Sequence, residues 1–359
     1  MPVPKLRLKL PSDRPSVFRD IETLKIGTHC AERPDGALTP KYGRWANEKS
    51  AHREGAVYRL LAAVDVPVPR ARAARLTYVM GGPKNAPFTR NALLVEDDGR
   101  FFRRLGGTQQ IDERAFTSAR EVFSAADAAR LSFAQAMIGN FDWCLRFYPD
   151  DHYRCNDRHP LWNVIALKTR GGTVPAIHDF DLSGLVTGRH LWFENTFNVA
   201  FSSTRSQAEV EVVGQLQRAR RLFSREQLNS TRMEFARRRQ AAYAAIAESP
   251  LDDGWRPSIQ AYLNAFFDAM ERDERFYLPV VVTSNARLFV DAAGTRPACG
   301  SDDAPIGTAV SEPLEMKDGR IRVVVLDTQW YWTSPRQCEV IRRQPVWIAA
   351  NAISQGFPK

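Results

Sequence analysis

Three stretches of the sequence decide how this chain folds: MIGNFDWC (137–144), NDRHPLWNV (156–164) and AIHDFDLSGLV (176–186). Each contains a side chain with a polar oxygen, in turn Asp142, Asn163 and Asp179. The largely apolar run 128–138 ahead of them predicts a buried helix that ends shortly before Asp142. These three oxygens are therefore expected at the ends of consecutive short elements.

The residues in these stretches are those that phosphoryl transfer requires. Asn163 opens the apolar run 163–167 and Asp179 closes the next one, so both are predicted at strand ends. Asp181 is expected to point the same way as Asp179, since side chains on a strand alternate. In such chemistry one carboxylate, here Asp142, orients the attacking hydroxyl. An amide oxygen and further carboxylates hold Mg²⁺ against the nucleotide phosphates.

The preceding part of the chain is predicted to be a small sheet that carries one helix. Alternating and apolar runs predict strands at 6–10, 24–29, 75–79 and 91–97, and helical spacing predicts a helix over 51–64. Lys9 and Lys25 lie on the first two strands and Glu54 lies on the helix. Phosphoryl transfer also needs a phosphate-binding lysine, usually braced by a helix glutamate. Lys25 with Glu54 is the preferred pair, Lys9 is the alternative, and either lysine could instead be a surface residue.

This ordered set resembles the protein-kinase-like fold in its atypical branch. The resemblance is closest to the bacterial spore-coat protein H (CotH) kinases and more distant to HipA and the phosphoinositide kinases. It covers roughly the first 275 residues and includes the strand ending Leu93-Leu94-Val95-Glu96. The resemblance implies a bilobal α+β fold, with a β-rich N-lobe at 1–97 and a mainly helical C-lobe at 98–276. It also implies ATP and Mg²⁺ as cofactors, and phosphorylation of a protein or another hydroxyl acceptor.

The resemblance assigns roles position by position. Asp142 matches the catalytic-loop aspartate. Asp157 is the alternative, because Asp-Arg-His followed by Asn163 resembles the corresponding loop of lipid kinases and HipA, with one extra residue. Asn163 matches the metal-binding asparagine under either choice, and Asp179 matches the aspartate of the DFG motif. Glu96 stands where the N-lobe meets the C-lobe, so backbone near it is expected to contact adenine.

Two departures from the family pattern matter. Residues 11–23 contain no glycine, so the Gly-rich loop of ordinary protein kinases is missing. That absence keeps a pseudokinase-type nucleotide-binding scaffold open as an alternative, and transfer of AMP on the same fold is another. The separation of Asp142 and Asn163 is long and implies an inserted loop, which Cys144 and Cys155 would bridge if oxidised.

The last part of the chain changes character. Short apolar runs separated by Gly, Asp and Pro predict an all-β module at 277–359, which resembles a bacterial SH3-like barrel. Its large aromatic residues are either barrel core or a surface for a glycan or a cell-wall peptide; they are Trp330, Tyr331, Trp332 and Trp347. Cys299 and Cys338 in this module could pair in an exported protein.

Composition excludes several classes of protein. The 359 residues are 44% hydrophobic and 25% charged, which disfavours disorder, collagen and coiled coil. A net charge of +9 favours anionic partners such as a nucleotide. The arginine clusters at 218–221 and 237–239 lack interleaved aromatics, so nucleic acid is not expected, although a basic polymer-binding protein remains a further reading. No run is long enough for a transmembrane segment. An exported chain without its signal and a cytoplasmic protein both fit.

Overall fold

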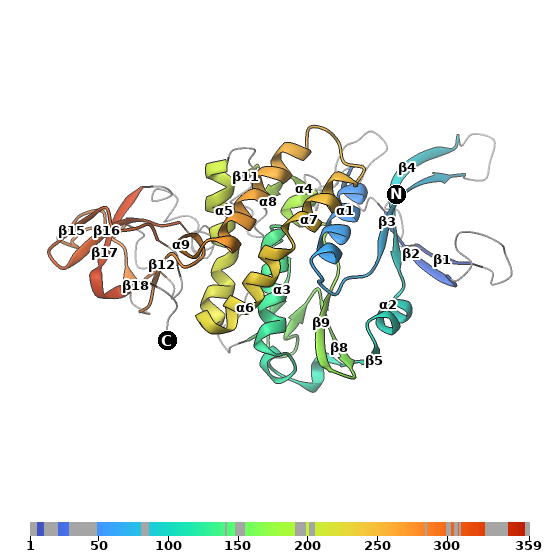
Figure 1. The fold of residues 1–359 in the computed structure, drawn as a ribbon, viewed down its shortest axis with the longest axis horizontal. Helices are drawn as coiled ribbons and strands as arrows, with labels where there is room; N and C mark the ends of the chain where they lie inside the picture. Colours follow the sequence, from blue (N-terminus) through green and yellow to red (C-terminus); the bar gives the residue numbers. More distant parts are fainter. Residues whose placement is uncertain are drawn as a thin grey trace. The chain divides into compact units, whose positions relative to one another are not determined.

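The computed structural model describes residues 6–10, 21–28, 49–79, 86–140, 142–147, 155–190, 199–200, 205–283, 286–298, 303–304, 308, 310–326 and 344–355. Helices and small sheets alternate along this chain, which confirms the α+β class (Figure 1). The chain divides into two compact units. The first comprises residues 1–124, 140–189 and 238–256, and the second comprises 125–139, 190–237 and 257–359. Cys299, Cys338, Trp330, Tyr331 and Trp332 lie outside the described residues.

The first unit contains a four-stranded antiparallel sheet covered by a helix. In sheet order its strands are β1 (Leu6–Lys9), β2 (Thr23–Thr28), β4 (Phe88–Glu96) and β3 (Ala71–Tyr78). Helix α1 (Ser50–Ala63) lies against Leu93, because a Cβ added to its Gly55 would stand 2.9 Å from that side chain. Gly27 pairs with Leu93 and Lys25 with Val95. Directly paired residues share a face, so Lys25 is on the face that α1 covers.

The sequence predicted these elements closely. The four strands fall where the alternating and apolar runs placed them, with shifts of a few residues at their ends. Helix α1 matches the expected helix over 51–64, and its apolar positions Val57, Leu60 and Leu61 are fully buried. A helix whose apolar residues recur at this spacing is stabilised mainly by burying that stripe against its neighbours.

The rest of the first unit holds small sheets and short helices. These elements are α2 (Asp98–Arg104), β5 (Gly107–Gln110), β6 (Cys144–Leu145), β7 (Leu161–Trp162), β8 (Val164–Thr169), β9 (Gly172–Ile177), α4 (Gly184–Thr187) and α7 (Arg239–Ala247). Short 3₁₀ helices at 113–115 and 119–121 follow β5. Strands β5, β8 and β9 form one antiparallel sheet, and β6 pairs with β7. Strand β9 ends at Ile177, so the expectation that Asp179 and Asp181 alternate on a strand is wrong.

Helices dominate the second unit up to Phe276. They are α3 (Ala125–Met137), α5 (Arg205–Leu222), α6 (Arg225–Arg237), α8 (Arg256–Glu271) and α9 (Asp273–Phe276), with the short strands β10 (Arg189–His190) and β11 (Val199–Ala200) near α5 in the sequence. The spacing of Ser224 and Gln227 in the sequence predicts a capping box, and the structure has one at the start of α6. The Ser224 N–H donates to Gln227 Oε1 at 2.9 Å, and the Gln227 N–H donates to Ser224 Oγ at 3.3 Å.

The described chain after Phe276 is β-rich and antiparallel. Its strands are β12 (Pro279–Val281), β13 (Ala286–Arg287), β14 (Asp303–Ala304), β15 (Glu315–Lys317), β16 (Arg320–Val324), β17 (Pro345–Ala349) and β18 (Ile353–Gln355). Strand β16 lies between β15 and β17, and β12 pairs with β18. Trp347 is buried, which places it in the core of this module. The barrel closure expected for an SH3-like module remains a prediction.

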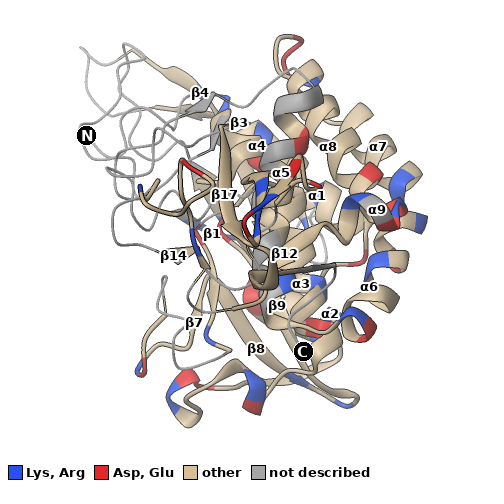
Figure 2. Ribbon diagram, turned by 90° about the vertical axis from the view of Figure 1, so that its left-hand side faces the viewer, with Lys and Arg blue, Asp and Glu red and all other residues tan. Residues whose placement is uncertain are grey.

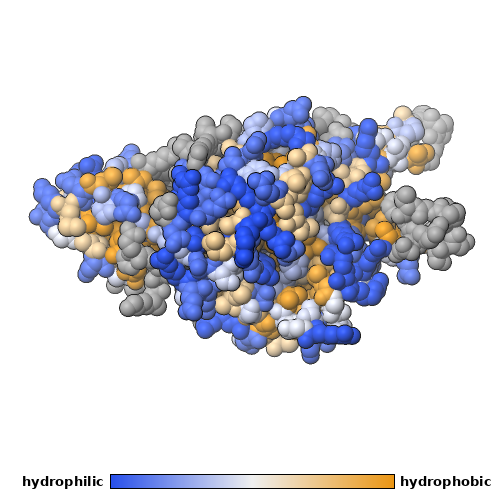
Figure 3. All heavy atoms as spheres, in the orientation of Figure 1, coloured by the Kyte–Doolittle hydropathy of each residue, from blue (hydrophilic) through white to orange (hydrophobic). Residues whose placement is uncertain are grey.

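Charges of both signs are interleaved in the second unit. Figure 2 shows positive and negative positions along α6, and hydrophilic side chains cover much of the face in Figure 3. Arg130 pairs with Glu234 at 2.6 Å, and Arg225 pairs with Asp273 at 3.1 Å. In the described part of the chain, no helix is both long and apolar enough to cross a bilayer.

Candidate active site

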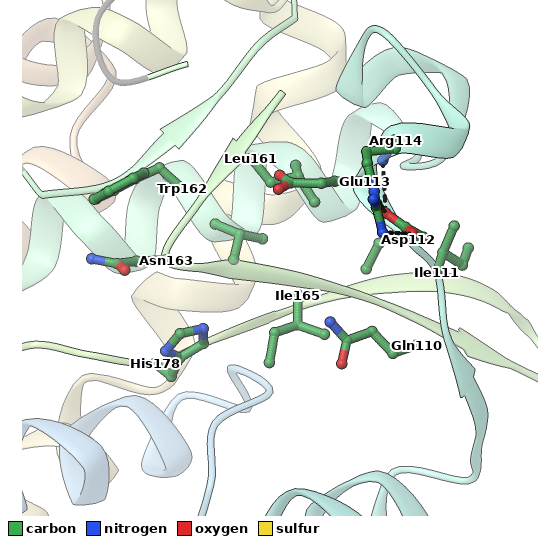
Figure 4. A pocket seen from close by; sticks show the side chains of 12 residues that line it. Gln110, Ile111, Asp112, Glu113, Arg114, Leu161, Trp162, Asn163, Ile165 and His178 are labelled. Carbon is green, nitrogen blue, oxygen red and sulfur yellow. Dashed lines mark hydrogen bonds and ion pairs between the residues drawn. The ribbon is translucent and has the colours of Figure 1, made fainter. Parts of the chain in front are cut away.

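The open end of the β8–β9 hairpin brings two of the predicted residues together. Val164 pairs with Ile177 at the last step of the ladder, so Asn163 and His178 leave it side by side. The His178 N–H donates to the Asn163 carbonyl oxygen at 3.4 Å. Figure 4 shows both side chains at the same end of a cavity. Asn163 therefore lies across from the residue immediately before Asp179.

Asp142 joins this group through the Asn163 side chain. Asn163 Nδ2 donates to the Asp142 backbone oxygen at 2.7 Å and reaches its Oδ2 at 3.3 Å. Both partners are acceptors, so the nitrogen of the amide must face Asp142 and its oxygen is the atom that can meet a cation. The Asp142 N–H donates to Asn140 Oδ1 at 3.0 Å, and both residues are buried. The loop that carries Asp142 is thus held by two asparagines.

Trp162 makes a second contact with the Asp142 carboxylate. Its indole Nε1 donates to Asp142 Oδ1 at 2.9 Å, while 41% of the residue remains exposed. Its backbone pairs with Cys144 in the β6–β7 ladder. Cys144 forms a disulfide with Cys155, so the structure contains the bridge across the inserted loop. Trp162 was missed from the sequence, although its place directly before Asn163 was an available signal.

Tyr58 on α1 connects Asp179 with Glu54. The Tyr58 hydroxyl accepts the Asp179 backbone N–H at 3.3 Å, and its ring packs edge-on against Phe180 at 4.8 Å. Burial raises the pKa of Tyr58 well above its ordinary value, and the charges of Glu54, Asp179 and Asp181 raise this pKa further. The charges of all three carboxylates therefore act on one hydroxyl. Tyr58 was also missed from the sequence, where its spacing of one helical turn from Glu54 was the signal.

Two site residues adopt a left-handed backbone conformation. Asn163 has φ 55° and Asp179 has φ 65°. Such conformations cost about 1–3 kcal/mol for residues other than glycine and persist where surrounding contacts impose them. Asn and Asp adopt this conformation more readily than other residues, and Asp65 and Asp318 also have a positive φ, so the conformation by itself does not mark a site.

The predicted phosphate-binding lysines lie on strands β2 and β1 and not among Asp142, Asn163 and Asp179. Lys25 Nζ pairs with Asp98 at 2.5 Å, at the first residue of α2, and both side chains are partly exposed. Lys25 thus shares a sheet face with α1 but reaches the Asp98 carboxylate, whereas Glu54 lies near Tyr58. Lys9 is exposed on β1.

Glu96 and Asp157 make contacts of their own. Glu96 is 5% exposed and accepts from Arg104 Nη2 at 2.8 Å and from the Arg70 N–H at 2.9 Å. The Glu96 N–H donates to the Arg70 carbonyl oxygen at 2.8 Å. Glu96 therefore connects the end of β4 with α2 and with the residue that precedes β3. Asp157 forms an ion pair with Arg146, and its side chain is 84% exposed.

A cavity of about 530 Å³ opens beside Asn163. Asn163, His178 and Trp162 line one end of it, and Gln110 and Ile165 line its floor along the β5–β8–β9 sheet (Figure 4). Pockets of about 300–1,000 Å³ are typical of small-molecule sites. The cavity therefore has the size of a ligand site and is lined by one of the predicted site residues, Asn163.

Asn163 and Asp179 suit a cation that binds together with a phosphate. They do not suit a metal centre in which the protein supplies every ligand. Within the described ranges, no group of three His, Cys, Asp or Glu side chains is arranged to hold a metal ion. Mg²⁺ needs only one or two carboxylates besides phosphate oxygens and water. The Asn163 amide oxygen and the Asp179 carboxylate are oxygen donors of the kind that this smaller requirement calls for.

Comparison with known proteins adds little. No protein-family model and no curated protein matches the chain. Eleven chains of solved structures match. One is HipA of Shewanella oneidensis MR-1, in a complex with HipB and operator DNA, at 15% identity and a TM-score of 0.28. The match covers 61% of this chain and 55% of the HipA chain, and at that score it carries no argument about the site.

Proposed function

We propose that the chain is a Mg²⁺- and ATP-dependent phosphotransferase with a kinase-like fold of the atypical, CotH-like branch. The observation that carries this proposal is the hydrogen bond from Asn163 to the Asp142 backbone oxygen, which joins residues 21 positions apart. The hairpin pairs His178 with Asn163, and Asp179 is the next residue along the chain. Catalytic and metal-binding oxygens must converge in this way before a phosphate can be transferred.

The proposed mechanism uses Asp142 to position the acceptor hydroxyl and to take its proton. The hydroxyl oxygen attacks the γ-phosphorus of ATP, the bond from that phosphorus to the β,γ-bridging oxygen breaks, and ADP leaves. Asn163 and Asp179, with Asp181 near them, would hold Mg²⁺, which supplies neutralisation of the phosphate charge. Trp162 and Asn163 keep the Asp142 carboxylate in place meanwhile.

The nucleotide is proposed to bind in the cavity lined by Asn163 and His178. Its volume of about 530 Å³ suits a ligand of this class. Lys25, or alternatively Lys9, would neutralise a phosphate. For Lys25 this means exchanging Asp98 for the ligand, which its partial exposure permits.

Asp179→Ala tests the proposal. The wild type should release ADP from Mg-ATP and gain thermal stability with Mg-ATP, and the variant should lose both. Asp65→Ala is the matched control, because Asp65 has a similar φ of 58° but pairs with Arg238 on the surface. If Asp179→Ala keeps the turnover and the thermal shift of the wild type, the enzyme assignment fails.

Alternatives on the same fold give different readouts. A thermal shift with ATP but no ADP would identify a pseudokinase-type scaffold. Intact mass separates phosphorylation, which adds about 80 Da, from AMP transfer, which adds about 329 Da. Retention on heparin that falls steeply with salt would favour a polymer-binding protein. The Cys144–Cys155 disulfide supports export, and a glycan or cell-wall peptide on the C-terminal module remains part of the proposal.

A further inference from the structure

Trp162 has two different surroundings. Its Nε1 donates to Asp142 Oδ1 at 2.9 Å, so one edge of the indole is fixed to the carboxylate. The residue is 41% exposed and lines the cavity beside Asn163 and His178. A large, exposed aromatic side chain whose indole N–H donates to a buried carboxylate is poorly explained by packing alone, since burial would serve packing better.

The backbone at Trp162 is held as firmly as its ring. Trp162 pairs with Cys144 and Leu161 pairs with Leu145 in the β6–β7 ladder. The Cys144–Cys155 disulfide ties β6 to the chain just before β7. The indole can therefore act as a fixed support for the carboxylate, because its own position is set by the ladder.

We infer that Trp162 is a positioning residue: its indole N–H sets the orientation of the Asp142 carboxylate while its ring forms a wall of the nucleotide cavity. This inference rests on the proposed function. A carboxylate oxygen accepts more than one hydrogen bond, so the contact with Trp162 leaves Asp142 able to accept from an acceptor hydroxyl or a water molecule. Holding the carboxylate in one orientation favours turnover, because misplacement of a catalytic group is costly in rate.

Two variants separate the N–H from the ring. Trp162→Phe keeps an aromatic wall and removes the donor, so it should lower kcat for ADP release from Mg-ATP by about tenfold or more, with KM for ATP within about twofold. Trp162→Ala removes the wall as well and should also raise KM. Water serves as the acceptor in this assay, so no physiological acceptor is needed.

Trp255→Phe is the matched control. Trp255 is buried in the same unit, and its Nε1 donates to the Leu185 backbone oxygen at 2.8 Å. This variant should lower the melting temperature and leave kcat unchanged, which would show that losing an indole hydrogen bond does not by itself reduce turnover.

The outcomes distinguish this inference from the proposed function. If the wild type releases ADP and Trp162→Phe matches it in kcat, the positioning role is excluded and the phosphotransferase assignment stands. If Trp162→Phe and Trp255→Phe lower kcat equally, the effect is one of stability and the inference also fails. If the wild type neither releases ADP nor becomes labelled by ATP, the proposed function fails and the inference falls with it.

Discussion

The hydroxyl of Tyr58 accepts the backbone N–H of Asp179 at 3.3 Å, across 121 positions of sequence. This contact joins α1 to the segment that carries the proposed metal ligand. Phe180, fully buried next to it, packs against the same tyrosine ring. Tyr58 thus contributes to the left-handed backbone of Asp179, which its neighbours must impose.

Tyr58→Phe should therefore reduce turnover more than stability. The variant keeps the ring against Phe180 and removes the acceptor for the Asp179 N–H, at a cost of about 1 kcal/mol in unfolding free energy. We expect kcat for ADP release to fall about tenfold as Asp179 shifts. Tyr262→Phe is the control, because the buried Tyr262 hydroxyl donates to the Ala136 carbonyl oxygen at 2.7 Å; it should cost similar stability without this loss of kcat.

The stability of the protein at alkaline pH should depend on Tyr58. Burial, then the charges of Glu54, Asp179 and Asp181, raise its pKa above the ordinary value of 10.0. Between that value and the raised pKa the unfolded chain releases the proton while the folded chain keeps it, so stability falls as pH rises. Below pH 10 this contribution is constant. In metal-free urea titrations the unfolding free energy of the wild type should fall more steeply above about pH 10 than that of Tyr58→Phe.

Asp142→Asn and Asp157→Asn should separate the two candidates for the catalytic aspartate. Asp142 is buried and contacts Asn163, whereas Asp157 is 84% exposed and pairs with Arg146. Loss of a general base costs about 10²–10⁴ in rate, so Asp142→Asn should nearly abolish ADP release. Asp157→Asn should stay within about twofold, as expected for an exposed ion pair. The reverse pattern would assign catalysis to Asp157.

Glu96 should matter for stability rather than for nucleotide binding. Its buried carboxylate accepts from Arg104 and from the Arg70 N–H, so Glu96→Gln leaves the Arg104 charge poorly compensated. We expect a loss of about 2 kcal/mol in unfolding free energy. Glu248→Gln, at a 72% exposed side chain paired with Arg59, should change it by less than about 0.5 kcal/mol. A raised KM for ATP at undiminished stability would support the adenine-hinge interpretation instead.

The Cys144–Cys155 disulfide should stabilise the first unit. Closing a loop of this length removes about 2–3 kcal/mol of conformational freedom from the unfolded chain. Cys155→Ala should lower the unfolding free energy by about that amount in urea titrations. Adding reductant to the unfolded variant before refolding should change nothing further. Peptide mapping that finds both thiols free in the wild type would remove the basis of this prediction.

Local patterns were enough to predict most of the regular structure. The helical spacing over 51–64 predicted α1, the apolar run 128–138 predicted the buried helix α3, and the spacing of Ser224 and Gln227 predicted the capping box of α6. Each signal depends on residues within a few positions of one another, where periodicity and capping act directly. The α+β class follows from the same patterns. Strand β9 was expected to extend through Phe180, but it ends at Ile177 and the backbone turns at Asp179.

The order of Asp142, Asn163 and Asp179 was visible along the chain, but their partners were not. Packing alone brought Tyr58 to Asp179 and Trp162 to Asp142, and it paired Lys25 with Asp98 and Glu96 with Arg104. These contacts depend on sheet register and on how helices lie on the sheets. The sequence therefore determines which chemical groups the chain carries. The hydrogen-bond partner of each group depends on elements that meet only after folding, because burial of the apolar faces decides which polar groups come within reach.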